Sequence, residues 1–251
     1  MSGHSKWATI KHKKGAADAK RGQLFTKIIR ELTVAAKEGG GNADMNPRLR
    51  TAIGRANDAN MPKDNIEKAI KKGTGELPGV VYESCSFEGY GQGGVAMMVE
   101  VLTDNKNRAT SEIRNIFSKK GGNMAGSGSV AWMFTPKGYI VVDKKAVAED
   151  EIFSISVDAG ADDVKTGDTT YEIFCEPKDL EKVKNALKGK NIKLESADLT
   201  KLPNSTVKLD GQQAKQILSL VESLEENDDV QKVYANFDIP DDVLEALAKE
   251  I

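Results

Sequence analysis

The architecture of this chain follows from residues 94–134, GVAMMVEVLTDNKNRATSEIRNIFSKKGGNMAGSGSVAWMF. The stretch begins with an apolar run over 94–102 that predicts a strand. Apolar residues then recur every three or four positions from 106 to 120, which is the period of an amphipathic helix. Gly121 and Gly122 end this helix, a small uncharged loop follows over 123–129, and residues 130–134 predict another strand. The two periods together indicate a domain of mixed sheet and helix.

Upstream of this stretch, residues 21–75 predict a small domain made only of helices. A stripe of apolar residues begins after Gly22 and stops at the three glycines 39–41. Asn46 and Pro47 form an N-cap and first-turn pair for a second helix, and Pro62 opens a third. After the helices, a strand is predicted at 80–88, and the glycine-rich turn 89–94 joins it to the strand at 94–102.

Downstream, residues 138–203 follow the order strand, helix, strand, strand, helix, strand. This is the split βαβ order of a ferredoxin-like unit. Turn-rich segments at 135–138 and 202–205 border the unit, as expected for an insertion. The tail predicts a strand at 206–209, a helix, a strand at 230–237 and a last helix from Pro240. We expect these tail pieces to complete the sheet begun at residue 80.

The predicted fold class is therefore α+β with three domains: a helical N-terminal domain and two α+β domains, one of them ferredoxin-like and inserted into the other. A flexible basic arm precedes them. The predicted boundaries are 1–20 for the arm, 21–75 for the helical domain, 79–135 with 205–251 for the discontinuous α+β domain, and 136–204 for the insertion.

Charge is distributed unevenly along the chain. Residues 1–75 hold 16 Lys and Arg against 7 Asp and Glu, whereas the remaining residues hold 20 against 31. A basic arm on an otherwise acidic chain is typical of a protein that grips a polyanion. The alternative for any single lysine is that it solvates a helix face, but a surface helix normally interleaves its charges.

Several classes of protein are disfavoured. Cys85 and Cys175 lie far apart without ligand spacing, so we expect both to pack in strands in a reducing compartment rather than form a disulfide or a zinc site. No apolar run approaches the ~20 residues of a membrane span and no secretory signal is readable, which predicts a cytoplasmic protein without a membrane partner. Motifs for phosphate loops, nucleophile elbows and zinc proteases are absent. We expect no enzyme activity, small-molecule substrate, cofactor or metal.

The candidate nucleic-acid contacts are cations of the arm and of two helix faces, together with a tryptophan that either stacks on bases or anchors the arm. They are Lys6, Trp7, Lys11, His12, Lys13, Lys14, Lys20, Arg21, Lys27, Arg48, Arg50, Arg55 and Arg108. A small uncharged loop is a candidate for pressing its backbone against a partner or RNA, with a plain flexible connection as the alternative. Its residues are Gly121, Gly122, Asn123, Met124, Gly126 and Gly128. No base-reading motif is present, so we expect binding directed by shape or by a partner.

Four segments in order along the chain closely resemble the YebC/PmpR family. They are SGHSKWATIKHKKGAADAKRGQLFTK (2–27), NMPKDNIEKAIKKGTG (60–75), TDNKNRATSEIRNIFSKKGGNMAGSGSVAWMF (103–134) and PDDVLEAL (240–247). The resemblance implies a bacterial cytoplasmic protein, with mitochondrial relatives that act as translational activators, and three domains of which one is inserted. It implies no enzyme activity. It also implies an insertion loop at 123–128 and nucleic-acid contacts at Lys11, His12, Lys13, Lys14, Lys20 and Arg21.

The resemblance further implies a non-enzymatic regulator of gene expression, because the family is commonly described as DNA-binding transcriptional regulators. The alternative is a ribosome-associated translation factor that binds ribosomal RNA or tRNA and relieves stalled translation. A hypothesis from another class is a protein–protein adaptor that docks on the transcription machinery through the ferredoxin-like surfaces. The residues themselves leave the choice between DNA and RNA open.

Overall fold

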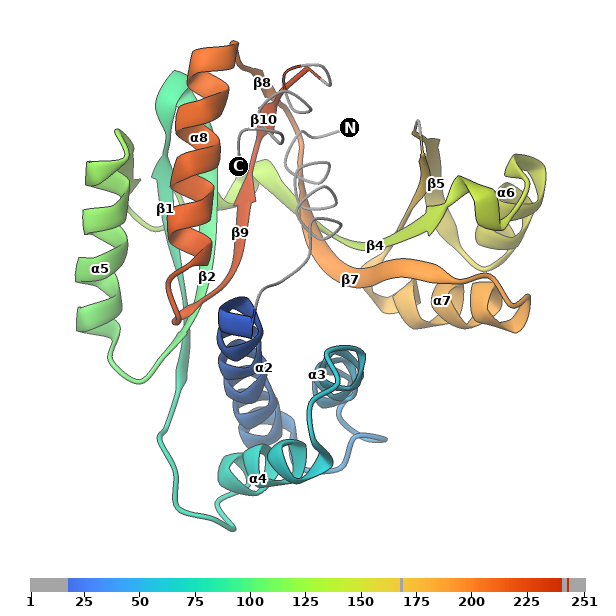
Figure 1. The fold of residues 1–251 in the computed structure, drawn as a ribbon, viewed down its shortest axis with the longest axis horizontal. Helices are drawn as coiled ribbons and strands as arrows, with labels where there is room; N and C mark the ends of the chain where they lie inside the picture. Colours follow the sequence, from blue (N-terminus) through green and yellow to red (C-terminus); the bar gives the residue numbers. More distant parts are fainter. Residues whose placement is uncertain (1–17, 168, 241–242, 244–251) are drawn as a thin grey trace. The chain divides into compact units, whose positions relative to one another are not determined.

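The computed structural model describes residues 18–167, 169–240 and 243, apart from the side chains of residues 18–20 (Figure 1). Clustering of contacts divides the chain into two compact units, one formed by Met133–Asn204 and the other by the segments on either side of it. One unit is therefore inserted into the other along the sequence. The α+β fold class with an inserted domain is confirmed, and the domain boundaries given above stay predictions.

Three helices form the N-terminal part: α2 (Asp18–Gly39), α3 (Pro47–Asp58) and α4 (Lys63–Gly73). Asn46 is the N-cap of α3, as predicted. Its Oδ1 accepts from the backbone N–H of Leu49 at 3.0 Å, and its Nδ2 donates to the carbonyl of Ala35 at 2.7 Å. One buried side chain thus starts α3 and ties it to α2. The predicted apolar stripes meet in a core that includes Leu32 and Ile66.

A four-stranded sheet in the order β3-β1-β2-β9 belongs to the same unit. Its strands are β1 (Glu83–Tyr90), β2 (Ala96–Thr103), β3 (Asn123–Ala125) and β9 (Val230–Ala235). Helices α5 (Lys106–Lys119) and α8 (Gly211–Glu225) lie against it (Figure 1). Met97, Val99 and Val101 alternate along β2 and share one core with Phe117 of α5 and Ile217 of α8. Both helices therefore cover the same face of the sheet.

Two of the strand predictions are wrong in detail. Val80 and Val81 are exposed and precede β1 instead of belonging to it. Residues 130–134 do not form the predicted strand, because Ala131–Met133 is a short 3-10 helix (η2) and Phe134 already begins the next strand. The strand at this edge is β3, inside the predicted loop. A short apolar run cannot by itself distinguish a strand from a buried turn.

Gly89 is the residue that lets β3 pair at this edge. It stands opposite Met124 in the antiparallel β1–β3 pair. A Cβ atom on residue 89 would lie 2.7 Å from the carbonyl oxygen of Asn123 and 2.7 Å from the ring of Phe117. The missing side chain therefore leaves the space that the β3 backbone and the α5 core share.

The tail joins the main sheet through β9 alone. Strands β8 (Val207–Lys208) and β10 (Phe237–Asp238) pair in parallel as a separate two-stranded sheet. The expectation that all the tail strands extend the main sheet is therefore wrong for these two. The helix predicted from Pro240 falls largely outside the described residues.

The inserted unit has the predicted ferredoxin-like order. It consists of β4 (Phe134–Asp143), α6 (Glu149–Asp158), β5 (Ala161–Thr166), β6 (Thr170–Cys175), α7 (Leu180–Gly189) and β7 (Leu194–Pro203). The strands form an antiparallel sheet in the order β5-β6-β4-β7, which is the split βαβ arrangement. Ile140, Ile173 and Val183 belong to its core. Cys175 is buried on β6 and Cys85 is half-buried on β1, both as free thiols, as predicted.

We expect Gly89→Ala to destabilise the protein, because the new methyl group would overlap the β3 backbone and the Phe117 ring. Overpacking of this kind costs about 1–3 kcal/mol. Urea unfolding of Gly126→Ala supplies the matched control, since a Cβ at residue 126 meets nothing within 4 Å. Equal stabilities of the two variants would contradict the assigned β1–β3 pairing.

Candidate nucleic-acid interface

The exposed side of α4 carries three lysines, Lys68, Lys71 and Lys72, spaced three and four positions apart. These spacings make them neighbours on the helix surface, while Ile66 and Ala69 face the core. Within the described part of the chain, none of the three lysines forms an ion pair. We call this group the α4 surface.

The α4 surface concentrates positive charge at a cost to the isolated helix. Like charges at these spacings each destabilise a helix by about 0.2–0.5 kcal/mol. Lys71 and Lys72 regain some of this from the helix dipole, because they lie in the last turn. The arrangement favours an anionic partner. None of these lysines is among the candidates proposed above; their shared spacing on the polar face is the signal that would have found them.

The structure separates the three arginines predicted on α3. Arg48 pairs with Glu31 at 2.8 Å and with Glu38 at 2.5 Å. The hydrogen bond with Glu31 is the main reason that the pKa of Arg48 is raised, although burial acts against it. Arg48 is therefore balanced by carboxylates of its own domain. Arg50 is exposed and donates to the backbone carbonyl of Asp44 at 3.3 Å, whereas Arg55 is half-buried.

Six of the arm candidates fall outside the described residues: Lys6, Trp7, Lys11, His12, Lys13 and Lys14. Lys20 lies within α2, where its side chain is not described. Arg21 is exposed, and its guanidinium carbon lies 5.4 Å from the centre of the Phe25 ring. Lys27 donates to the carbonyl of Glu225 at the end of α8. Of the α2 cations, Arg21 is thus the one that the structure leaves on the surface.

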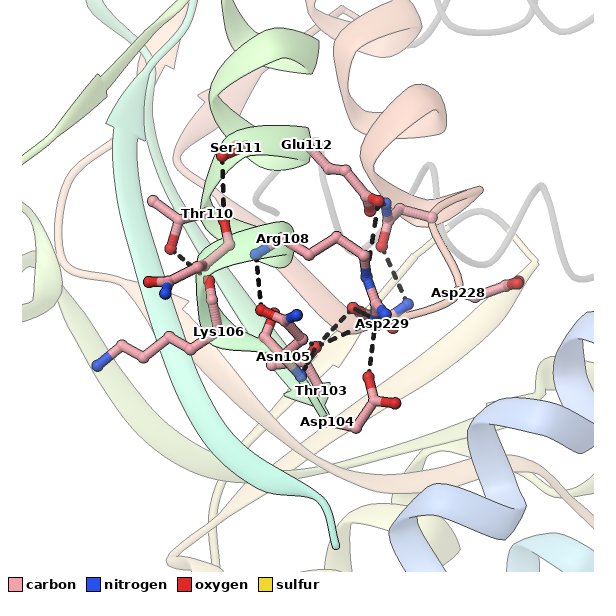
Figure 2. Close-up of polar contacts among 12 residues, drawn as sticks. Thr103, Asp104, Asn105, Lys106, Arg108, Thr110, Ser111, Glu112, Asp228 and Asp229 are labelled. Carbon is pink, nitrogen blue, oxygen red and sulfur yellow. Dashed lines mark hydrogen bonds and ion pairs between the residues drawn. The ribbon is translucent and has the colours of Figure 1, made fainter. Parts of the chain in front are cut away.

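Arg108 lies in a network around the buried carboxylate of Asp229 (Figure 2). Its guanidinium donates to Asp229 at 2.8 Å and to Asp104 at 2.9 Å. The hydroxyl of Thr103 donates to the same Asp229 oxygen at 2.7 Å. Arg30, from α2, pairs with the other oxygen. The Asp229 side chain is only 4% exposed, so this carboxylate is spent inside the protein.

The network ties the helical part of the chain to the sheet. Arg30 also donates to the carbonyls of Asp228 at 2.7 Å and Leu102 at 3.2 Å. Burial raises the pKa of Asp229, but hydrogen bonds from Arg108, Thr103 and Arg30 outweigh it and hold the pKa below the usual 3.8. The carboxylate is therefore ionised at neutral pH. The role of Arg108 as a nucleic-acid contact stays a prediction, while the structure shows it serving this internal site.

The glycine-rich segment after α5 is anchored to the body by Glu88. The buried carboxylate of Glu88 accepts from the backbone N–H groups of Gly128 at 2.7 Å, Val130 at 2.6 Å and Ala131 at 2.9 Å. Burial raises the pKa of Glu88, but the three N–H donors outweigh it, so the pKa lies below the usual 4.5. A charged acceptor with three donors holds the segment in one conformation.

The predicted loop is thus divided into a built part and an exposed tip. Asn123 and Met124 belong to β3, and Met124 is half-buried against the core. Gly122 packs close to Tyr90 and Phe117, and Gly121, which has a φ of 74°, precedes it. Residues 126–128, including Gly126 and Gly128, form the exposed tip. Only this tip and its neighbours have the character expected of a loop that meets a partner.

Other kinds of site have little support in the described part of the chain. No group of three or more His, Cys, Asp or Glu there is placed to hold a metal ion. None of the helices there is long and apolar enough to cross a membrane. An open hollow of about 580 Å³ lies beside α4, lined by Lys71 together with Glu67 and Glu76. Its two carboxylates disfavour an anionic ligand.

We expect Asp229→Asn to lower the free energy of unfolding at neutral pH by about 3 kcal/mol, because Arg30 loses its buried partner. The Asp229 pKa is depressed in the folded state, so its stabilisation is present above pH 3.8 and is lost as the pH falls through the folded pKa. The difference between variant and parent should therefore shrink below pH 3.8. Urea unfolding at neutral and acid pH measures it. Asp104→Asn, at a carboxylate that is 38% exposed, is the control and should cost less than about 1 kcal/mol.

Replacing Glu88 with glutamine should loosen the segment that it anchors. The amide supplies one acceptor oxygen and brings an NH₂ group toward N–H donors, so at least one charge-assisted hydrogen bond is removed. Such bonds contribute about 1.5–3 kcal/mol, so amide exchange at Gly128, Val130 and Ala131 should accelerate about tenfold or more. Glu83→Gln, at an exposed position on the same strand, should leave these amides protected. Unchanged exchange in Glu88→Gln would refute the anchoring role.

Comparison with known proteins places the chain in a family. Residues 5–76 match the family model of the TACO1/YebC protein N-terminal domain, and residues 82–237 match that of the TACO1/YebC second and third domain. A "Probable transcriptional regulatory protein" of Dictyoglomus turgidum is 56% identical over 99% of this chain and 100% of its own length. One of the same name from Desulfosudis oleivorans is 58% identical over 98% and 100%.

A solved structure is similar over nearly the whole chain. The crystal structure of a conserved hypothetical protein from Aquifex aeolicus has a TM-score of 0.81 to this fold at 49% identity. The match covers 89% of this chain and 93% of that protein. Both matched family models, the full-length relatives and this shared fold agree: the chain belongs to the TACO1/YebC family.

Proposed function

We propose that this protein is a non-enzymatic, cytoplasmic regulator of gene expression that acts on transcription by binding DNA. Its relatives carry the name of probable transcriptional regulatory proteins, which supports this level of regulation. The binding surface is the N-terminal part of the chain, where residues 1–75 hold 16 cationic and 7 anionic side chains.

The observation that carries the proposal is the α4 surface. Lys68, Lys71 and Lys72 are exposed neighbours without carboxylate partners among the described residues, whereas Arg48 and Arg108 are consumed by internal carboxylates. A helix that keeps three ammonium groups together, against their repulsion, suits a run of phosphates. Arg50 adds an exposed guanidinium to the same helical domain.

Contacts of this type determine how the protein binds. Lysines that meet phosphates position the protein on a nucleic acid without reading its sequence. Each such contact releases condensed counterions, so the affinity falls steeply with salt concentration. Specificity then arises from the shape of the nucleic acid or from a protein partner in the transcription machinery.

We expect the triple variant Lys68→Ala, Lys71→Ala, Lys72→Ala to bind duplex DNA more weakly than the parent. The slope of log affinity against log salt should become about one unit shallower for each phosphate that the variant no longer neutralises. Fluorescence anisotropy with a labelled duplex across a salt series measures both quantities. The matched control removes three lysines from the inserted unit, Lys182, Lys188 and Lys190, and should leave the slope unchanged.

The same titration separates the alternatives. An unchanged salt slope in the α4 triple variant would remove this surface from the proposal. Binding of structured ribosomal RNA that is far tighter than binding of any duplex DNA would favour the ribosome-associated alternative. Cleavage of labelled DNA or RNA in the presence of magnesium would contradict the non-enzymatic assignment.

A further inference from the structure

Trp132 is an exposed aromatic residue next to the loop tip. Its side chain is 72% exposed, more than that of any other aromatic residue in the described part of the chain. Tryptophan is highly buried on average, because its ring loses favourable burial when it faces water. An exposed indole at a defined position therefore calls for a ligand.

The indole is held in place by its polar edge. Its Nε1–H donates to the carbonyl of Ser129 at 3.1 Å, and the hydroxyl of Tyr90 donates to the same carbonyl at 3.3 Å. That carbonyl lies between Gly128 and Val130, whose N–H groups are fixed by the Glu88 carboxylate. A buried charge thus fixes the backbone to which the ring is hydrogen-bonded, and the ring is oriented before any ligand arrives.

The surroundings of the ring lack charge. Residues 121–136 contain no Asp, Glu, Lys or Arg, in a chain of which 29% is charged. Glu88, the carboxylate that contacts this segment, is 4% exposed and occupied by three N–H donors. A phosphate therefore finds no cation in this segment, whereas the flat face of a base needs none.

The surroundings also lack the apolar rim of a protein-docking site. The exposed neighbours along the chain are Gly126, Ser127 and Gly128, and the nearest other exposed aromatic group is Tyr90 at 37%. Protein interfaces instead place their aromatic anchors inside a contiguous patch of several hundred Å². A single ring amid glycine and serine suits a flat ligand that stacks on it.

We propose that Trp132 is a stacking site for one unpaired nucleobase of the nucleic acid that this protein binds. Residues 126–128 offer uncharged backbone groups beside the ring, and Glu88 acts as a positioning residue. The proposal rests on the proposed function and deepens it: the bound nucleic acid contains a single-stranded or flipped base at this point. The phosphates of that nucleic acid meet the cations of the N-terminal part.

The test uses the full-length chain and oligonucleotides of about 12 nucleotides, a length within the range that single-strand-binding domains cover. Single-stranded DNA and single-stranded RNA of one sequence form two arms, which distinguish the two sources of an unpaired base. An abasic strand of equal length and a blunt duplex form two further arms. The chain has two tryptophans, Trp7 and Trp132, so a Trp7→Phe parent makes Trp132 the only indole emitter.

Base-containing single strands should quench the Trp132 emission, and the abasic strand should not. Trp132→Ala should weaken binding of the single strand by about 5- to 150-fold, the range that one stacked base contributes. Its salt slope should remain that of the parent, because stacking releases no counterions. Trp132→Phe should restore most of the affinity, and Phe153→Ala, at an aromatic residue that is 54% exposed on α6, should have no effect.

Three results would overturn the proposal. Single-strand affinity that is unchanged in Trp132→Ala, or equal quenching by the abasic strand, excludes stacking while the α4 variant still reports on the proposed function. Loss of a crosslinked protein partner in Trp132→Ala, with nucleic-acid affinity intact, assigns the ring to a protein instead. If the parent binds none of the four probes, the proposed function fails and the stacking site fails with it.

Discussion

The buried carboxylate of Asp229 is the interaction on which the larger of the two units depends. It lies in the turn between α8 and β9 and is shared by Arg30 of α2 and Arg108 of α5. Its backbone also pairs with the end of β2, since the Asp229 carbonyl accepts from the N–H of Leu102 at 2.8 Å. An ionised group can be buried only if it is paired and hydrogen-bonded, so the helices and strands that supply its partners must meet at this point.

This constraint also sorts the cations of the protein into two groups. Arg30, Arg48 and Arg108 balance buried or half-buried carboxylates, and their charge is largely cancelled before it reaches solvent. The α4 lysines and Arg50 have no such carboxylate partner among the described residues, and their charge acts outward. Planar guanidinium groups suit fixed internal pairs, whereas hydrated ammonium groups suit contacts that form and break with phosphate.

Much of the fold could be predicted from local patterns in the sequence. Asn46-Pro47 predicts the start of α3 because capping depends on residues a few positions apart, and the strand–helix order of 138–203 indicates the ferredoxin-like unit for the same kind of reason. The site was less accessible. Arg108 looks like a surface cation on its helix, and its main partner, Asp229, is 121 positions away. Trp132 looked like part of an apolar strand until its exposure was known.

The sequence by itself determined the α+β class, the insertion and the concentration of positive charge at the N-terminal end, because helical and strand periods and net charge are properties of neighbouring residues. Only the tertiary structure decided which cations remain available, that β3 forms within a glycine-rich segment, and that an indole ring faces solvent beside it. These features depend on atoms brought together from distant positions: Gly89 and Asn123, Glu88 and Val130, Arg30 and Asp229. Pair energies of this kind are set by distance and burial in the folded chain, and no local pattern contains them.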